Sequence, residues 1–194
     1  MVTYFYKPST GFHVKNTLAL ALLAVASLPL AAHAEGSYIG GGVGRAEHKV
    51  AVNSIGSYKD SDVAIKIFTG YNFDKNFGIE AGYSDLGEIE AGNTGISVKG
   101  RSFYAAGTAT LALNEKLSLT GKLGVAKNRA RMNLPGGDLK DTKTDTLLSV
   151  SAAYEVTKNL AAYVEIENYG NMAQPKGGGS LKVKVISTGL RFSF

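Results

Sequence analysis

The side chains that could perform chemistry are few, and their spacing matches no catalytic set. A lipase or deacylase needs a serine nucleophile, a histidine base and a carboxylate. Ser149 and Ser151 share one face of an alternating segment, but no histidine accompanies them, because His48 lies in a distant polar stretch. Glu165 and Glu167 resemble an acid–base pair. At this spacing on one strand they are better suited to pairing with lysine and arginine, so we expect no catalytic residue.

Metal and cofactor chemistry is equally weakly supported. The chain has no cysteine, which excludes thiolate metal sites and disulfides. The glycine run 40–44 resembles a phosphate loop but lacks its lysine and its helix. A possible calcium cluster is interleaved with lysines, which indicates a solvated loop: Asp138, Lys140, Asp141, Lys143 and Asp145. We expect no metal and no cofactor.

The composition narrows the class of protein. The chain has 194 residues, 24 of them glycine, and its mean hydropathy is −0.01. This length suits one domain, whereas a bundle of membrane helices would need several apolar runs of about 20 residues. A net charge of +5 without a basic stripe argues against nucleic-acid binding. Short alternating segments with frequent turns indicate an all-β protein.

The N-terminal residues have the features of a bacterial export signal. Lys15 precedes a short apolar core, Pro29 interrupts it, and Ala32 and Ala34 form a small-x-small cleavage site. The apolar run is too short for the alternative, a transmembrane anchor.

The expected domain boundary follows from this signal. Residues 1–34 are the signal peptide, and cleavage after Ala34 leaves 35–194 as the mature domain. Because 1–13 precede any normal signal, we expect the true start at Val14, which N-terminal sequencing of the precursor would test.

The mature chain contains eight segments in which apolar and other residues alternate. This is the period of a β-strand, in which successive side chains point to opposite faces. The segments are long enough to cross a bilayer with tilt. They are 37–45, 63–73, 77–85, 103–113, 117–126, 148–156, 160–168 and 184–194.

The connections alternate between short turns and long polar loops. The expected short turns are 74–76, 114–116 and 157–159, and the expected long loops are 46–61, 86–101, 127–146 and 169–182. Short turns at one end and long loops at the other are typical of outer-membrane barrels. We therefore predict an eight-stranded antiparallel transmembrane β-barrel.

The faces opposite the apolar rows carry charged residues. In a soluble barrel of lipocalin type, the fold-level alternative, these charges would face water. In an eight-stranded membrane barrel they would fill the lumen as an ion-pair network. The predicted members are Lys66, Glu80, Lys122, Glu155, Glu165, Glu167 and Arg191.

Other residues are expected to meet the lipid. Aromatic residues near the short turns would form an interfacial girdle: Phe73, Phe77, Tyr154, Phe192 and Phe194. Near the long loops, Arg129, Arg131, Lys182 and Lys184 are candidates to contact lipopolysaccharide phosphates, since arginine binds phosphate bidentately. The alternative is that these four residues only increase solubility.

Four parts of the chain resemble the OmpA-like transmembrane barrel family of Gram-negative outer membranes. They are the signal ending 32–34, the opening 38–44, the block 70–83 and the C-terminus 189–194. The resemblance covers the whole mature chain but not the peptidoglycan-binding domain of longer members. It implies that Phe192 and Phe194 form the signal read by the barrel-assembly machinery. Glu80 matches the family's lumen glutamate, while other cluster positions fall on Thr108, Ala153 and Tyr163.

The expected function is structural and not enzymatic. We expect a monomer in the outer membrane that contacts lipid and lipopolysaccharide and stabilises the envelope. One alternative is an adhesin or host-factor binder acting through the long loops, with an unknown ligand. Another is a narrow ion channel, although a lumen of eight strands is filled by side chains.

Overall fold

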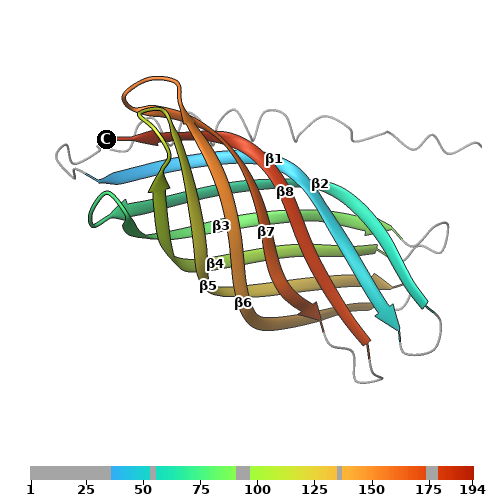
Figure 1. The fold of residues 1–194 in the computed structure, drawn as a ribbon. Helices are drawn as coiled ribbons and strands as arrows, with labels where there is room; N and C mark the ends of the chain where they lie inside the picture. The colour runs from blue at the N-terminus through green and yellow to red at the C-terminus, as the bar shows by residue number, and fades with distance from the viewer. Residues whose placement is uncertain (1–35, 53–55, 91–96, 135–136, 174–178) are drawn as a thin grey trace, which may run out of the picture. The chain divides into compact units, whose positions relative to one another are not determined.

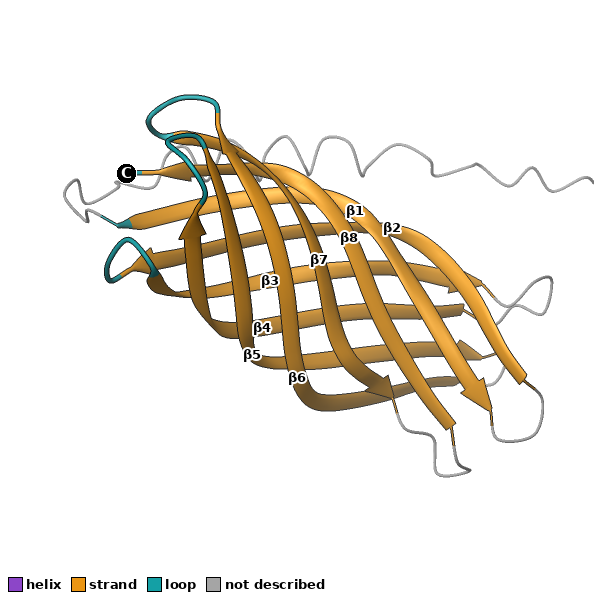
Figure 2. Ribbon diagram, in the orientation of Figure 1, coloured by secondary structure: helices purple, strands orange, loops and turns teal. Residues whose placement is uncertain are grey.

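The computed structural model describes residues 36–52, 56–90, 97–134, 137–173 and 179–194, and all its regular elements are strands (Figures 1 and 2). The predicted signal peptide, residues 1–34 with Val14, Ala32 and Ala34, therefore lies outside the described residues. The strands are β1 Ser37–Val52, β2 Gly56–Asn72, β3 Phe77–Glu90, β4 Ser97–Ala112, β5 Leu117–Leu134, β6 Gly137–Glu155, β7 Leu160–Ala173 and β8 Gly179–Ser193.

The eight strands form one closed antiparallel barrel. Each strand pairs with its neighbours in sequence, and β8 closes the ring on β1 (Figure 1). The closing seam includes a hydrogen bond from the Phe194 amide to the Ser37 carbonyl, 3.0 Å. In the part of the wall that faces lipid, closure satisfies the backbone of every strand and leaves no free edge, as a lipid environment demands. No helix in the described parts of the chain is long and apolar enough to cross a membrane.

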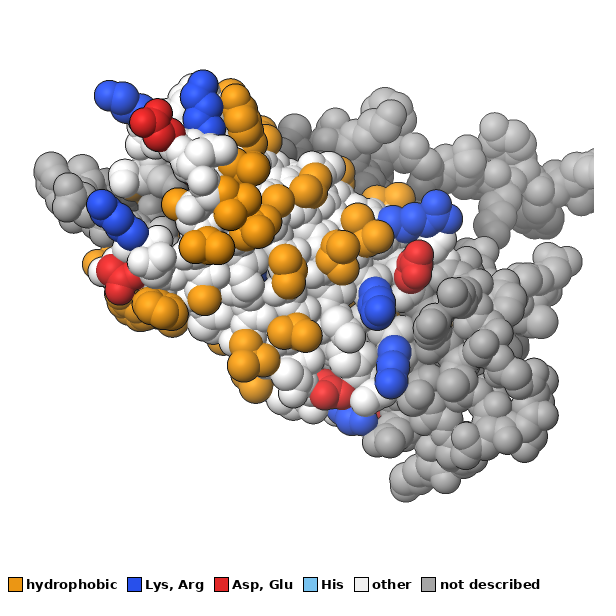
Figure 3. Space-filling view, in the orientation of Figure 1, with side chains coloured by type: hydrophobic (Ala, Val, Ile, Leu, Met, Phe, Trp, Pro, Cys, Tyr) orange, Lys and Arg blue, Asp and Glu red, His pale blue; other side chains and the backbone are white. Residues whose placement is uncertain are grey.

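The barrel is apolar outside and polar inside. Leu123 on β5 and Val63 on β2 face outward and are 64% and 63% exposed. Lys66 on β2 faces the lumen and is 4% exposed. Hydrophobic side chains cover the middle of the wall, and charged side chains gather toward its ends (Figure 3). This arrangement confirms the transmembrane barrel, and the lipocalin-type alternative, with its apolar face inward, is wrong.

The three short turns are confirmed, and each is closed by its first polar side chain. Oδ1 of Asp74 accepts the amides of Asn76 at 2.7 Å and Phe77 at 2.8 Å. Asn114 caps the second turn, and the Thr157 hydroxyl caps the third, in the same way. Aspartate, asparagine and threonine favour such turns because their side chains accept hydrogen bonds from the local backbone.

The predicted long loops are mostly strand. The segments expected as loops, 46–61, 86–101, 127–146 and 169–182, are largely occupied by extensions of the strands into long hairpins. The residues that join these hairpins lie outside the described part of the chain. The loop prediction was wrong because it followed side-chain polarity, whereas the hydrogen bonds of a β-ladder join backbone groups and do not need an apolar face.

Three register shifts interrupt the ladder in the described residues, and two of them are β-bulges at equivalent places on β3 and β7. At the first, Gly87 has a φ of +80°, and Oδ2 of Asp62 on β2 accepts the Glu88 amide at 2.6 Å. At the second, Gly170 has a φ of +66°, and Oδ2 of Asp145 accepts the Asn171 amide at 2.8 Å. In each case an aspartate on the preceding strand ties down the bulge. Neither bulge was predicted from the sequence.

Candidate functional site

The centre of the lumen holds a chain of five charged side chains that alternate in sign. Lys122 Nζ lies 2.6 Å from Glu80 Oε1 and 2.8 Å from Glu165 Oε1. Lys66 pairs with the other oxygen of Glu165, and its Nζ lies 3.0 Å from Glu167 Oε1. These residues come from β2, β3, β5 and β7, so their ion pairs connect strands on different sides of the barrel wall across the lumen.

Neutral hydroxyl groups complete the coordination of two of the three buried carboxylates, those of Glu80 and Glu165. Tyr104 donates to Glu80 Oε1 at 2.7 Å, and Tyr38 donates to Oε2 at 3.1 Å. The Ser149 hydroxyl donates to Glu165. A buried charge is tolerated only when its remaining lone pairs are satisfied, and these donors supply hydrogen bonds that the lysines alone cannot.

Below the charged chain, toward the short turns, aromatic rings pack against the ammonium groups. Lys66 Nζ and Lys122 Nζ lie 5.1 Å and 5.2 Å from the centre of the Phe68 ring. Phe68 in turn contacts Tyr38 and Tyr163 edge to face, with ring centres 6.3 Å and 5.6 Å apart. Cations are attracted to ring faces in a desolvated setting. Phe68 therefore stabilises both lysines while it fills the barrel.

Above the charged chain, toward the long hairpins, the lumen is closed by apolar side chains. Leu86, Leu147, Tyr169 and Val183 are fully buried there. The Tyr169 hydroxyl lies 2.7 Å from the Ser84 hydroxyl, and Asn128 donates to the Tyr169 carbonyl at 2.8 Å. This apolar layer was not predicted, because the sequence analysis expected charged groups to fill the lumen.

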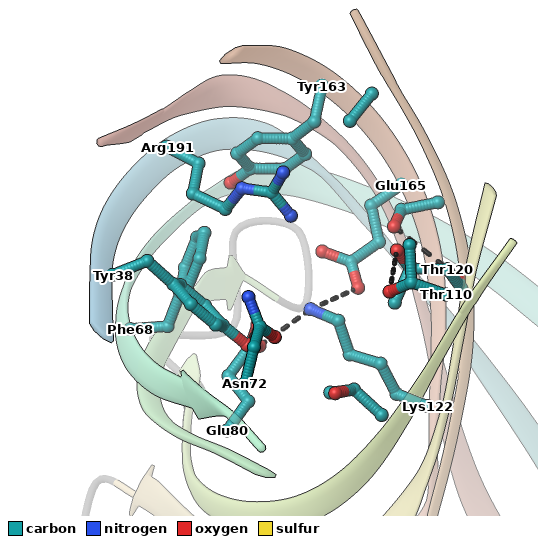
Figure 4. A pocket seen from close by; sticks show the side chains of 13 residues that line it. Tyr38, Phe68, Asn72, Glu80, Thr110, Thr120, Lys122, Tyr163, Glu165 and Arg191 are labelled. Atoms are coloured by element: carbon teal, nitrogen blue, oxygen red, sulfur yellow. Dashed lines mark hydrogen bonds and ion pairs between the residues drawn. The ribbon is translucent and has the colours of Figure 1, made fainter. Parts of the chain in front are cut away.

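The space left between these groups is small. A cavity of about 20 Å³ lies in the half of the lumen nearer the short turns, lined among others by Tyr38, Lys122, Glu165 and Arg191. Figure 4 shows Lys122 crossing this space between Glu80 and Glu165. A volume of this size holds about one water molecule. The lumen thus accommodates no bulk solute in this conformation.

The structure divides the seven predicted lumen residues into two groups. Five form the central chain, whereas Glu155 and Arg191 form a separate pair at the short-turn mouth, with Nη2 3.2 Å from Oε1. Glu155 is 36% exposed, so this second pair is hydrated. The family resemblance aligns three further positions of the family's ion-pair cluster with Thr108, Ala153 and Tyr163. All three side chains are buried in the lumen.

The remaining predicted residues lie on the outer wall. Phe192 and Phe194 stand side by side, with ring centres 5.3 Å apart. Arg129 and Arg131 project outward from β5, and Lys182 and Lys184 project outward from β8. β6 and β7 separate these two pairs, so the four basic residues do not form one cluster.

The candidate catalytic and metal-binding residues are not assembled into a reactive site in the described residues. Glu165 and Glu167 belong to the central chain, and Ser149 donates to Glu165. The side chain of His48 lies outside the described residues. Asp145 ties down the β7 bulge. Among the side chains that the structure describes, no group of three or more His, Cys, Asp or Glu residues could hold a metal ion.

A family model described as the outer membrane protein beta-barrel domain matches residues 17–194. The chain belongs to this family. Membership of this family places the protein in the outer membrane, in agreement with the apolar outer wall of the barrel. A Haemophilus influenzae relative, named only as an uncharacterized protein, is 27% identical over 190 residues, which cover 93% of this chain and 100% of the relative.

Solved outer-membrane barrels share the fold. Neisserial surface protein A superimposes with a TM-score of 0.62 at 20% identity, over 82% of this chain and 98% of its own. The N-terminal barrel of Pseudomonas aeruginosa OprF gives 0.59 at 12% identity, over 84% and 100%. Ail, the attachment invasion locus protein of Yersinia pestis, gives 0.52 at 18% identity, over 81% and 99%. At these identities the likeness shows the fold alone.

Proposed function

We propose that this outer-membrane barrel is a monomeric structural protein that stabilises the envelope and carries out no catalysis. The observation that carries the proposal is the filled lumen. Five charged side chains and an apolar layer occupy it, and the residual cavity holds about one water molecule. A barrel sealed in this way offers its wall and its hairpins to partners, with no path through its centre.

The proposal is tested by deleting the gene and scoring the leakage of detergent and large antibiotics through the envelope. We expect leakage to rise and the full chain to restore the barrier. The full chain should be compared with a version in which 46–61, 86–101 and 132–139 are shortened, which keeps the proposed lipid contacts Arg129 and Arg131. Restoration by the shortened barrel supports a structural role. A deletion strain with an intact barrier would contradict the proposal.

The expected partners of the wall are lipid and lipopolysaccharide. Arg129, Arg131, Lys182 and Lys184 are the proposed contacts to lipid phosphates, and their outward orientation supports this role. Unchanged stabilisation by lipopolysaccharide after substitution of all four would count against it. Phe192 and Phe194 are proposed as the signal for the barrel-assembly machinery, since both rings lie exposed beside the closing seam. Export with cleavage after Ala34 is part of the same proposal.

A second candidate function is binding of a surface or host ligand. The length of the β5–β6 hairpin favours it, since these strands comprise 18 and 19 residues, whereas about 9–11 suffice to cross a bilayer. Ail, which shares the fold, is named as the attachment invasion locus protein of Yersinia pestis. If only the full chain restores the deletion strain, the hairpins carry the function and this candidate replaces the first.

A further inference from the structure

Over its outer half, the β6 strand has a strand partner on one side only. Its ladder with β5 extends to the pair Leu134 and Gly137, whereas its ladder with β7 ends at the pair Leu148 and Asn168. Beyond Asn168, the described residues of β7 pair with β8 alone. Residues 137–147 of β6 therefore form an edge beside which no described strand lies. We call these residues the β6 edge.

The β7 bulge is the reason why the ladder ends there. Pairing of β6 with β7 stops two residues before Gly170, the glycine of positive φ, and bulges commonly terminate pairing. Asp145 stabilises the bulge by accepting the Asn171 amide at 2.8 Å. The same side chain accepts the Thr146 amide at 2.8 Å, the first amide of β6 beyond the ladder. Specific side chains thus hold the β6 edge apart from β7.

Alternate amides of the β6 edge point away from β5. In an antiparallel ladder, the residues of a strand bond alternately to its two neighbours. The Glu155 amide donates to the Lys116 carbonyl at the start of β5, at 2.8 Å. The Val156 amide donates to the Leu160 carbonyl at the start of β7, also at 2.8 Å. Odd-numbered residues of β6 therefore bond to β5, and even-numbered residues face the β7 side. The amides of the β6 edge that face this open side include those of Lys140, Thr142 and Thr144.

The β6 edge lies beyond the apolar wall, at the end of the barrel opposite the C-terminus (Figure 1). Leu148 is the last outward residue of the apolar wall on β6 and is 57% exposed. The next outward residues toward the hairpin are Thr146, Thr144 and Thr142. Since short turns mark the periplasmic end of such barrels, this end faces the cell exterior. An edge is tolerated in water, where it is also a template for a further strand.

The side chains of the β6 edge favour a polar strand as its neighbour. Thr142, Thr144 and Thr146 are exposed on its outward face. Threonine suits a strand, and it pairs well with threonine or serine across a ladder. Lys140, also exposed, continues this row and favours an acidic residue opposite it. No proline lies within 137–147, and the ladder with β5 has no bulge there, so two common devices that block an edge are missing.

A second copy of this chain in the same membrane fits the β6 edge poorly. Copies in one membrane have the same orientation, so two β6 strands side by side would run parallel, and parallel pairing is less stable per residue. In register, this pairing would place Lys140 opposite Lys140, and like charges directly opposite one another are destabilising. A segment of a different polypeptide can approach in the antiparallel direction.

We propose that the β6 edge binds an extended segment of another protein as an added antiparallel strand. The backbone of that segment pairs with Lys140, Thr142 and Thr144. Its outward side chains are threonine or serine opposite the threonines and an acid opposite Lys140. In this mode of recognition, main-chain hydrogen bonds supply the affinity and alternate side chains supply the specificity. The inference rests on the second candidate function, binding of a surface ligand, and names the class of partner and the site.

The first test measures amide hydrogen exchange by NMR on the full chain refolded in detergent micelles. The amides of Thr142 and Thr144 should exchange faster than the amide of Asp141, which faces β5. Equally slow exchange of all three would overturn the assignment of an open edge. The probe is a cyclic β-hairpin peptide whose outer strand alternates threonine and serine, with one glutamate placed to lie opposite Lys140. Saturating probe should slow the exchange of Thr142 and Thr144 about tenfold and leave Asp141 unchanged. Unchanged exchange of Thr142 and Thr144 at about 1 mM probe would overturn the proposal.

Two variants separate the backbone from the side chain. Thr142→Pro removes the amide that faces the open side, and proline is tolerated at such edge positions. Thr142→Ala is the matched control, because it removes the side chain and keeps the amide. We expect Thr142→Pro to bind the probe about fivefold more weakly, from the loss of one hydrogen bond, and Thr142→Ala to bind within about twofold of the unmodified chain. Equal affinities of the two variants would overturn the backbone mode. If Thr142→Pro does not fold, Thr144→Pro and Thr144→Ala replace the pair.

Two further results distinguish the inference from its rivals. A dimer of the unmodified chain in sedimentation, abolished by Thr142→Pro, would assign the β6 edge to a second copy and overturn the proposal. If only the full chain restores the deletion strain and the probe does not bind, the second candidate function stands and the inference falls. If the probe binds but the shortened barrel restores the barrier as well as the full chain does, the second candidate function falls although the edge binds a strand.

Discussion

At the scale of single residues, the contrast between Glu165 and Glu155 shows how location decides the energetic weight of an ion pair. Glu165 is buried between two lysines, whereas Glu155 pairs with Arg191 at a hydrated mouth. Removing one partner of a buried network leaves an uncompensated charge in a medium that solvates it poorly. An exposed pair contributes little because water and salt screen it.

This contrast predicts unequal effects of two equivalent substitutions. Glu165→Gln should lower the free energy of unfolding by about 3–5 kcal/mol, and Glu155→Gln should lower it by less than about 1 kcal/mol. Urea unfolding of the refolded barrel in lipid vesicles measures both. Similar losses in the two variants would mean that the central chain is hydrated and is not the buried network described above.

Asp74 predicts a pH effect confined to one turn. The amides of Asn76 and Phe77 hold the pKa of Asp74 below its ordinary value, because they donate to the ionised carboxylate. A lowered pKa in the folded state means that this stabilisation is complete above the ordinary aspartate pKa of about 3.9. It is lost as the pH falls through the folded-state value.

Two variants separate the cap from its charge. Asp74→Ala should unfold at lower urea than the unmodified chain at pH 7, because the turn loses its acceptor. Asp74→Asn should remain close to the unmodified chain at pH 7, since Asn114 performs the same role with an amide oxygen. It should also lack the part of the acid sensitivity that Asp74 contributes. An undiminished acid response in Asp74→Asn would assign that response to other groups.

At the scale of elements, the bulges on β3 and β7 show how side-chain hydrogen bonds stabilise a local bend in a strand. Asp62 and Asp145 each accept the amide that follows a glycine of positive φ. The same acceptor–bulge device occurs on β3 and β7. Each bulge changes the direction of its strand near the end of the barrel where the long hairpins begin.

These bulges predict position-specific intolerance to alanine. A Cβ at Gly87 or Gly170 would approach the Asp62 or Asp145 side chain to within 2.5 Å or 2.6 Å, and the positive φ is itself unfavourable. Gly87→Ala and Gly170→Ala should each lower stability by about 1–2 kcal/mol. Gly107→Ala is the control, since space is open there. A Gly107→Ala loss as large as the other two would show that the effect is not specific to the bulges.

At the scale of the whole molecule, the order of layers along the lumen decides permeability. Apolar side chains close the hairpin end, the charged chain occupies the centre, and aromatic rings fill the space below it. An ion would have to cross a closely packed layer whose polar groups, among them Asn128 and the Tyr169 hydroxyl, already hydrogen-bond within the protein, which is costly. The lumen is therefore sealed by two different physical barriers in series.

This layering predicts that the barrel conducts no ions. In planar bilayers, the purified protein should give no steady current above the background of protein-free membranes. Glu165→Gln, which weakens only the charged chain, should also remain closed because the apolar layer is intact. Reproducible unitary currents from the unmodified chain would instead favour the narrow-channel alternative.

The sequence by itself determined the number of strands, their inward and outward faces and the three short turns. The period-2 alternation carries this information because successive side chains of a strand face lipid and lumen in turn. Val63 and Leu123 face lipid, for example, whereas Lys66 and Lys122 face the lumen. Turn chemistry is local as well, so Asp74 could be recognised from its neighbours alone. The alternation also made the outer-membrane location predictable.

Only the tertiary structure decided which charges meet and how far the strands extend. Partners such as Lys66 and Glu165 are 99 residues apart, and their contact depends on closure of the barrel across its lumen. The apolar layer and the bulges likewise combine residues from separate strands. The alternation of residues determines whether a side chain faces lipid or lumen, whereas closure of the barrel and strand register determine which side chains it contacts.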